Sequence, residues 1–82
     1  MKTLRISIAV AKYGLEYLRG KPIEMGGGRV AYIHEADLDE AIALYADEPD
    51  LAFRHDRFYA TELPNSPYGG FWVKNNANIL LN

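Results

Sequence analysis

The sequence predicts one α+β domain spanning residues 1–82, in which a small antiparallel sheet of four to five strands carries one helix on a face. Three observations predict this fold. Residues 4–11 alternate between large apolar and smaller or polar side chains, residues 38–46 repeat apolar side chains at helical spacing, and glycine, proline and asparagine separate such segments. A chain of 82 residues, 49% of them hydrophobic, is long enough for one core and too short for two.

The first strand is predicted from the N-terminal alternation, which has the period of a half-buried strand. The chain would turn at residues 12–14 and return as a second strand within residues 15–24. A helix over residues 10–18 is the competing interpretation. Gly14 in its middle would cost about 1 kcal/mol relative to alanine, and the tyrosine, isoleucine and valine residues favour strands, so the hairpin is preferred. The apolar residues of the alternation are Leu4, Ile6, Ile8 and Val10.

A helix is predicted at about 37–47, and it would pack on one face of the sheet. Asp37 can cap its N-terminus, and Glu40 three residues later completes the spacing of a capping box. Pro49 stops the helix, because the residue before a proline is pushed out of the α region. One apolar stripe would face the sheet: Leu38, Ala41, Ile42, Tyr45 and Ala46.

The rest of the chain is predicted to supply strands and their connections. In chain order these are a glycine connector at 26–28, strands at 29–34 and 51–63, a loop at 64–70 and a final hairpin over 71–81. The second of these strands contains a candidate break at His55-Asp56. The hairpin would turn at Asn75-Asn76, because asparagine tolerates positive φ.

Composition and motifs exclude several classes of protein. Without cysteine the chain has no disulfide framework, no thiol nucleophile and no cysteine-based zinc site. No apolar run approaches the roughly 18 residues of a spanning helix, and Arg5 and Ser7 interrupt the N-terminal segment that could resemble a signal peptide. The glycine run precedes a predicted strand and no GK[ST] motif exists, so no phosphate loop is predicted. We therefore expect a cytoplasmic protein with no metal, cofactor or membrane partner.

The acidic residues are concentrated in one segment. Residues 35–50 hold seven of the eleven aspartates and glutamates, and residues 30–52 contain no lysine or arginine. Asp47 and Glu48 would lie at the negative end of the predicted helix, where cations are favoured. This pattern predicts a surface that binds a protein rich in arginine or lysine, for example a nucleic-acid-binding complex. The predicted contact residues are Glu35, Asp39, Glu40, Asp47, Glu48 and Asp50. Alternatively, the basic residues of 1–29 lie beside this segment and neutralise it.

Two other functions remain open from the sequence. On a strand, His55 and Arg57 would share a face, and together they could act as proton shuttle and cation in a small hydrolase or nuclease. His34 has no second histidine or cysteine nearby to form a metal site. Aromatic residues interleaved with basic ones could stack single-stranded bases, although a pI near 5.6 disfavours nucleic acid. These residues are Tyr13, Tyr17, Arg19, Phe53, Arg54, Arg57, Phe58, Tyr59, Phe71, Trp72 and Lys74.

In size, acidity and absence of motifs, the chain resembles the small accessory proteins of phages and mobile elements, including inhibitors of host defence such as anti-CRISPR proteins. This resemblance is of general type and assigns no residue a role. It implies a non-enzymatic protein that binds another protein and blocks or regulates it, in the cytoplasm of the host cell if a phage encodes it. An exposed sheet edge would also permit self-association.

Overall fold

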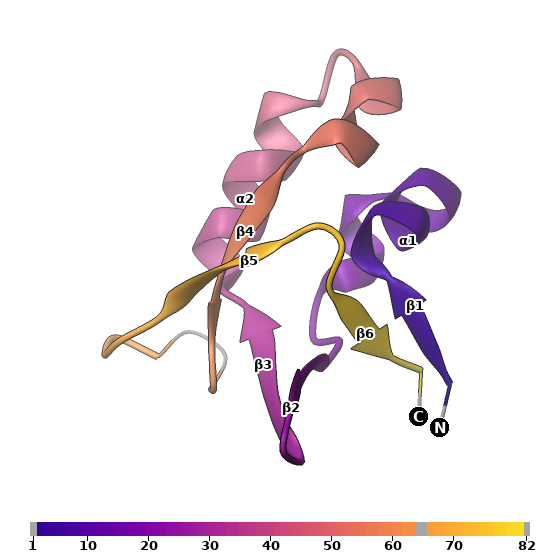
Figure 1. The fold of residues 1–82 in the computed structure, drawn as a ribbon. Helices are drawn as coiled ribbons and strands as arrows, with labels where there is room; N and C mark the ends of the chain where they lie inside the picture. The colour runs from indigo at the N-terminus through magenta and orange to yellow at the C-terminus, as the bar shows by residue number, and fades with distance from the viewer. Residues whose placement is uncertain (1, 64–65, 82) are drawn as a thin grey trace.

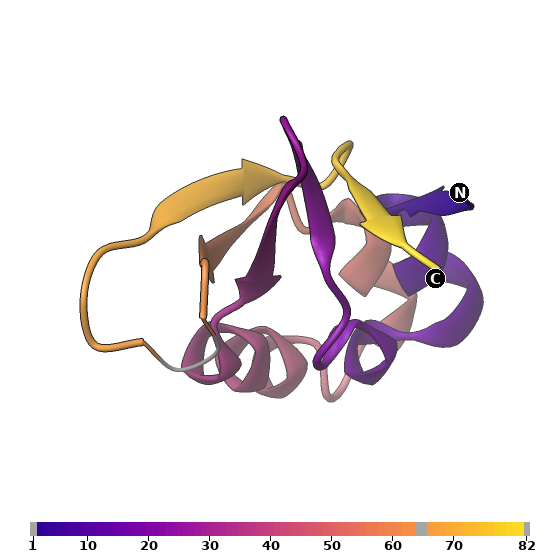
Figure 2. The same cartoon turned by 90° about the horizontal axis from the view of Figure 1, so that it is seen from below.

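The computed structural model describes residues 2–63 and 66–81. Within these residues, six antiparallel strands form one sheet in the order β1-β6-β2-β3-β4-β5, and both α-helices lie on the same side of it (Figures 1 and 2). The α+β class with an antiparallel sheet is confirmed, with more strands and helices than expected. The strands are β1 (Thr3–Arg5), β2 (Ile23–Gly26), β3 (Arg29–Ile33), β4 (Arg57–Thr61), β5 (Phe71–Lys74) and β6 (Asn78–Leu80). The helices are α1 (Ile6–Tyr13), α2 (Glu35–Leu44) and the 3₁₀ segments η1 (Leu15–Leu18) and η2 (Pro49–Arg54).

The predicted N-terminal hairpin is wrong. Strand β1 is three residues long and leads directly into α1, and only β2 remains of the predicted return strand. The backbone N–H groups of Ile6 and Ser7 donate to the carbonyls of Ala77 and Asn75, both at 2.9 Å. These bonds satisfy N–H donors that a helix N-terminus otherwise leaves unpaired, and the acceptors belong to the far end of the chain. The competing helix over 10–18 also differs from the structure, because α1 ends at Tyr13 and is followed by Gly14, whose φ of 92° breaks the helix.

The glycine run makes a turn and is not a flexible connector. Strands β2 and β3 pair as a hairpin, and Gly27 and Gly28 between them have φ values of 60° and 77°. Two successive positive φ values are those of a type I′ turn, which matches the twist of the two strands. The predicted strand at 29–34 is confirmed as β3.

Helix α2 confirms the predicted helix, with shifted ends. It begins at Glu35, and the imidazole of His34 accepts from the Ala36 N–H at 3.3 Å, so His34 is the capping residue and Asp37 is not. Of the predicted stripe, Leu38 and Ala41 are buried, while Ile42 and Tyr45 are half-buried against the same core. The helix ends at Leu44, and the chain has left it before Pro49 is reached.

The C-terminal half departs most from the prediction. The predicted strand at 51–63 is two elements, η2 and β4, and Pro64 and Asn65 of the predicted loop lie outside the described residues. Strands β5 and β6 do not pair with each other: β5 pairs with β4, and β6 lies between β1 and β2. Asn75 explains the crossing, because its N–H and its side-chain amide donate to the carbonyls of Asp56 (2.9 Å) and His55 (2.7 Å). The predicted hairpin over 71–81 is therefore wrong in its pairing, although both strands exist.

One hydrophobic core lies between the sheet and the helices. The core includes Phe58 and Ala60 of β4, Val73 of β5 and Ile79 of β6, so all three C-terminal strands contribute to it. The apolar C-terminal tail is accommodated in this way, with Leu80 and Leu81 half-buried. The largest fully buried side chains are Phe58, Ile6, Leu18, Ile23, Leu38, Ile79 and Thr61.

Candidate functional site

The structure distributes the six predicted contact residues over three elements. Glu35 lies half-buried in the first turn of α2, and Asp39 and Glu40 are exposed on its outer side. Asp47 and Glu48 lie in the turn after α2, and Asp50 is in the first turn of η2. The predicted row along one helix is therefore a surface that bends from α2 onto η2.

The helix-dipole argument for Asp47 and Glu48 is wrong. Helix α2 ends at Leu44, so neither residue is part of it, and Glu48 is the residue that precedes Pro49 at the start of η2. Carboxylates near the N-terminus of a helical segment face its positive end, where they are favoured. The local backbone thus accounts for acids at these positions.

Asp39 has a cationic partner, as expected from the alternative in which the basic residues of 1–29 lie beside the acidic segment. The Arg19 guanidinium donates to Asp39 at 2.5 Å and to Glu16 at 2.5 and 3.0 Å. The hydrogen bond to Arg19 holds the pKa of Glu16 below its ordinary value, and the bonds to Glu16 and then Asp39 raise the pKa of Arg19. Basic and acidic segments therefore lie side by side at this point. The acidic surface without an ion pair, among the described residues, consists of Glu40, Asp47, Glu48 and Asp50.

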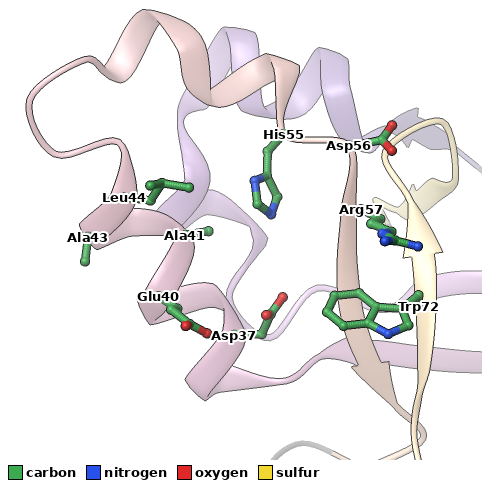
Figure 3. Close-up of a pocket in the computed structure, with 9 residues that line it drawn as sticks. All are labelled: Asp37, Glu40, Ala41, Ala43, Leu44, His55, Asp56, Arg57 and Trp72. Carbon is green, nitrogen blue, oxygen red and sulfur yellow. The ribbon is translucent and has the colours of Figure 1, made fainter.

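An open cleft of about 800 Å³ lies between α2 and the strands β4 and β5 (Figure 3). Leu44 and Trp72 line it, with 66% and 56% of their surface exposed. Its remaining lining residues are Asp37, Glu40, Ala41, Ala43, His55, Asp56 and Arg57.

Asp37 is fixed at the base of this cleft. Its Oδ2 accepts from the backbone N–H of Tyr59 at 3.0 Å, and the Tyr59 carbonyl accepts from the N–H of His34 at 2.8 Å. Strand β3 ends at Ile33, and the carboxylate of Asp37 on α2 supplies the acceptor for the next N–H of β4. Asp37 is thus part of the fold, and its second oxygen is left to face the cleft.

His55 is also held by its neighbours. Its Nδ1 lies 3.0 Å from the Tyr45 hydroxyl, and its ring packs against Phe58 with centroids 4.8 Å apart. Figure 3 shows the imidazole directed into the space between α2 and β4, whereas the Arg57 guanidinium extends toward β5. The two residues proposed for a hydrolase therefore line one cleft and point apart. Among the described residues, no group of three or more histidine, aspartate or glutamate side chains could hold a metal ion.

The aromatic and basic residues separate into different environments. Strand register places Arg57 opposite Lys74 and Tyr59 opposite Trp72, so these four share one face of β4 and β5, and Arg57 and Trp72 also line the cleft. The Arg57 guanidinium lies 5.4 Å from the Trp72 ring centroid, and the Tyr59 and Trp72 rings meet edge to face at 5.3 Å. Phe58 is instead buried in the core.

Sequence reasoning missed the cleft itself. In the sequence prediction, Leu44 was not part of the apolar stripe of the helix, and Trp72 was only one aromatic residue of a predicted hairpin. No local pattern relates two positions so far apart in the chain. The only local signal was that Leu44 falls beside the stripe predicted to be buried.

None of the described helices is both long and apolar enough to cross a membrane. Comparisons with protein-family models, curated proteins and solved structures found no match. The geometry of the chain's own residues is therefore the basis for its proposed function.

Proposed function

We propose that this protein acts without catalysis, by binding the basic surface of another protein and blocking or regulating it. The observation that carries the proposal is Leu44, a large apolar side chain that is 66% exposed beside the acidic surface of Glu40, Asp47, Glu48 and Asp50. An exposed apolar residue within a charged rim has the layout of a protein interface, in which the apolar contact supplies affinity and the rim supplies orientation.

The charge of the surface defines the partner. Four exposed carboxylates, none in an ion pair within the described structure, would meet arginine and lysine side chains at little desolvation cost and speed the encounter. Proteins that bind nucleic acid carry such basic surfaces. An inhibitor of a nucleic-acid-binding defence complex, of the anti-CRISPR kind and acting in the cytoplasm of a host cell, fits this chemistry.

The test compares two reversals of the same residue type. Glu48→Lys reverses a charge on the proposed surface, and Glu24→Lys reverses an exposed one on β2, at the opposite end of the molecule (Figure 1). The wild-type protein, immobilised, is used to isolate its partner from the source cells, and the affinity of each variant for that purified partner is then measured at several salt concentrations. We expect Glu48→Lys to weaken binding at least tenfold, because like charges across an interface cost several kcal/mol, and Glu24→Lys to leave it unchanged.

Replacing both Asp47 and Glu48 with lysine should weaken binding further and lower the free energy of unfolding by no more than about 1 kcal/mol, since both precede η2. His34→Ala and His55→Ala should leave the salt dependence of partner binding unchanged, because neither histidine is one of the four carboxylates of the acidic surface. Equal affinities for Glu48→Lys and Glu24→Lys, or association that does not depend on salt, would contradict the proposal.

A second candidate is binding of single-stranded nucleic acid by one face of β4 and β5. The observation that favours it is the shared face of Arg57, Tyr59, Trp72 and Lys74, which combines rings with cations. A labelled oligothymidine measures it directly: salt-sensitive binding that is lost in Trp72→Ala would place this function first.

As a third proposal, the partner is a second copy of this chain. Strand β5 ends the sheet and pairs only with β4, so its other edge could pair with a strand of that copy. The mass of the protein in solution across a concentration series tests it.

A further inference from the structure

We propose that the cleft between α2 and β4–β5 receives an arginine side chain of the partner protein. This inference rests on the proposed function for the existence of a basic partner, and it adds the place where one of that partner's side chains is recognised. The cleft is continuous with the acidic surface, because Glu40 belongs to both.

Two apolar walls suit the stem and the flat face of a guanidinium. Leu44 on α2 and Trp72 on β5 stand on opposite sides of the cleft, and Figure 3 shows the indole lying across β4 toward α2. Both side chains are more than half exposed, so their burial by a ligand would be favourable. Arginine stacks on aromatic rings more readily than lysine because its charge is planar and weakly hydrated.

Two carboxylates supply the matching charge. Asp37 and Glu40 are three residues apart on α2, so they lie on the same side of the helix. Asp37 is already held in place by the Tyr59 N–H at 3.0 Å, which means that its orientation need not be fixed when a ligand binds. A guanidinium presents donors in a rigid fork that carboxylates accept in pairs, whereas an ammonium does not.

The overall charge of the lining excludes the opposite class of ligand. Asp37, Glu40 and Asp56 contribute three carboxylates, against the single guanidinium of Arg57. A phosphate or a carboxylate ligand would be repelled by this excess. Arg57, 5.4 Å from the indole centroid, also shows that Trp72 accepts a guanidinium as a neighbour within the same protein.

The experiment uses Trp72 as its own reporter, because it is the only tryptophan of the chain. Three capped peptides serve as probes, Gly-Arg-Gly, Gly-Lys-Gly and Gly-citrulline-Gly, and the indole fluorescence and indole N–H NMR resonance are followed during titration. Citrulline keeps the shape of arginine and removes its charge. We expect saturable changes with the arginine peptide, several-fold weaker binding of the lysine peptide and none of the citrulline peptide.

Matched variants locate the site. Asp37→Asn/Glu40→Gln removes two charges from the cleft, and the asparagine carbonyl can still accept from Tyr59. Asp47→Asn/Glu48→Gln removes two charges outside the cleft. The first variant should bind the arginine peptide about tenfold more weakly, and the second should bind it like the wild type.

Saturable binding of citrulline as tight as arginine, no saturable binding of arginine, or equal effects of the two double variants would each overturn the inference. The proposed function is judged separately. If the peptides fail while Glu48→Lys still weakens binding of the whole partner, the arginine cleft is wrong and the acidic surface stands.

Discussion

The packing of α2 yields the sharpest prediction about stability, because two neighbouring side chains on one helix differ in burial. Leu38 is fully buried, whereas Ile42, one turn later, lies at the rim of the core and is half-buried. Replacing either with alanine removes a large aliphatic side chain from the same helix. The two variants therefore compare burial while chemistry and helix propensity stay close.

The expected losses follow from the exposure of each side chain. Leucine-to-alanine changes in cores cost about 2–5 kcal/mol, and Leu38 has no exposed surface, so we expect about 3–5 kcal/mol for Leu38→Ala. Ile42 already contacts water over part of its surface, so Ile42→Ala should cost about 1–2 kcal/mol, less than a fully buried site would imply. A domain of this size has a total stability of about 4–12 kcal/mol, so the first change removes a large part of it.

Urea denaturation followed by circular dichroism measures both losses. With a slope of about 1 kcal/mol per molar urea, Leu38→Ala should lower the midpoint by about 3–5 M and Ile42→Ala by about 1–2 M. If Leu38→Ala is too unstable to give a folded baseline, Ile42→Ala still gives a measurable transition. A loss for Ile42→Ala equal to or greater than that for Leu38→Ala would refute the assignment of core and rim on α2.

Three further outcomes are expected. A Cβ on Gly70 would lie 2.4 Å from the ring of Tyr59, so Gly70→Ala should displace that ring and shift the fluorescence emission of its neighbour Trp72. Gly28→Ala is the control: its Cβ would meet open space, but its φ is 77°, so it should leave the emission unchanged and lower stability by about 1 kcal/mol. Arg19→Gln should lower stability slightly in urea melts at low salt and leave it unchanged at high salt, because its ion pairs are exposed and salt screens them. Because the pKa of Glu16 is lowered in the folded state, its contribution is present above the ordinary pKa and lost as pH falls through the lowered one, so wild type and Arg19→Gln should converge in stability in acid. His55→Ala should lower the thermal melting temperature, because the contact with the Tyr45 hydroxyl is lost. If the His55→Ala protein stays folded but no longer binds the partner, His55 has a functional role.

Sequence patterns were reliable where a segment's neighbours in space are also its neighbours in the chain. The stripe around Leu38 predicted α2, and the glycine turn with its flanking residues predicted a connection into β3. Composition and length predicted the fold class for the same reason, since alternating strands and one amphipathic helix leave few ways to bury their apolar faces.

The N-terminal segment shows how an ambiguous pattern is decided elsewhere in the molecule. The apolar residues of this segment fit a strand at every second position, and they fit a helix at Ile6, Ala9 and Val10. In the structure those three are buried and Ile8 is 48% exposed, as the helix requires. The bonds from Ile6 and Ser7 to residues 75 and 77 favour the helix. A local pattern contains no information about acceptors that lie almost seventy residues away.

The candidate site follows the same division. The sequence by itself determined that this is an acidic α+β domain without cysteine, with its carboxylates concentrated around one helix, because these are properties of composition and short-range periodicity. Only the tertiary structure decided that Arg19 neutralises Asp39, that Asp47 and Glu48 precede η2, and that Leu44 and Trp72 face one cleft. Each of these depends on how β4, β5 and α2 are placed in space, and that placement comes from burying one shared core.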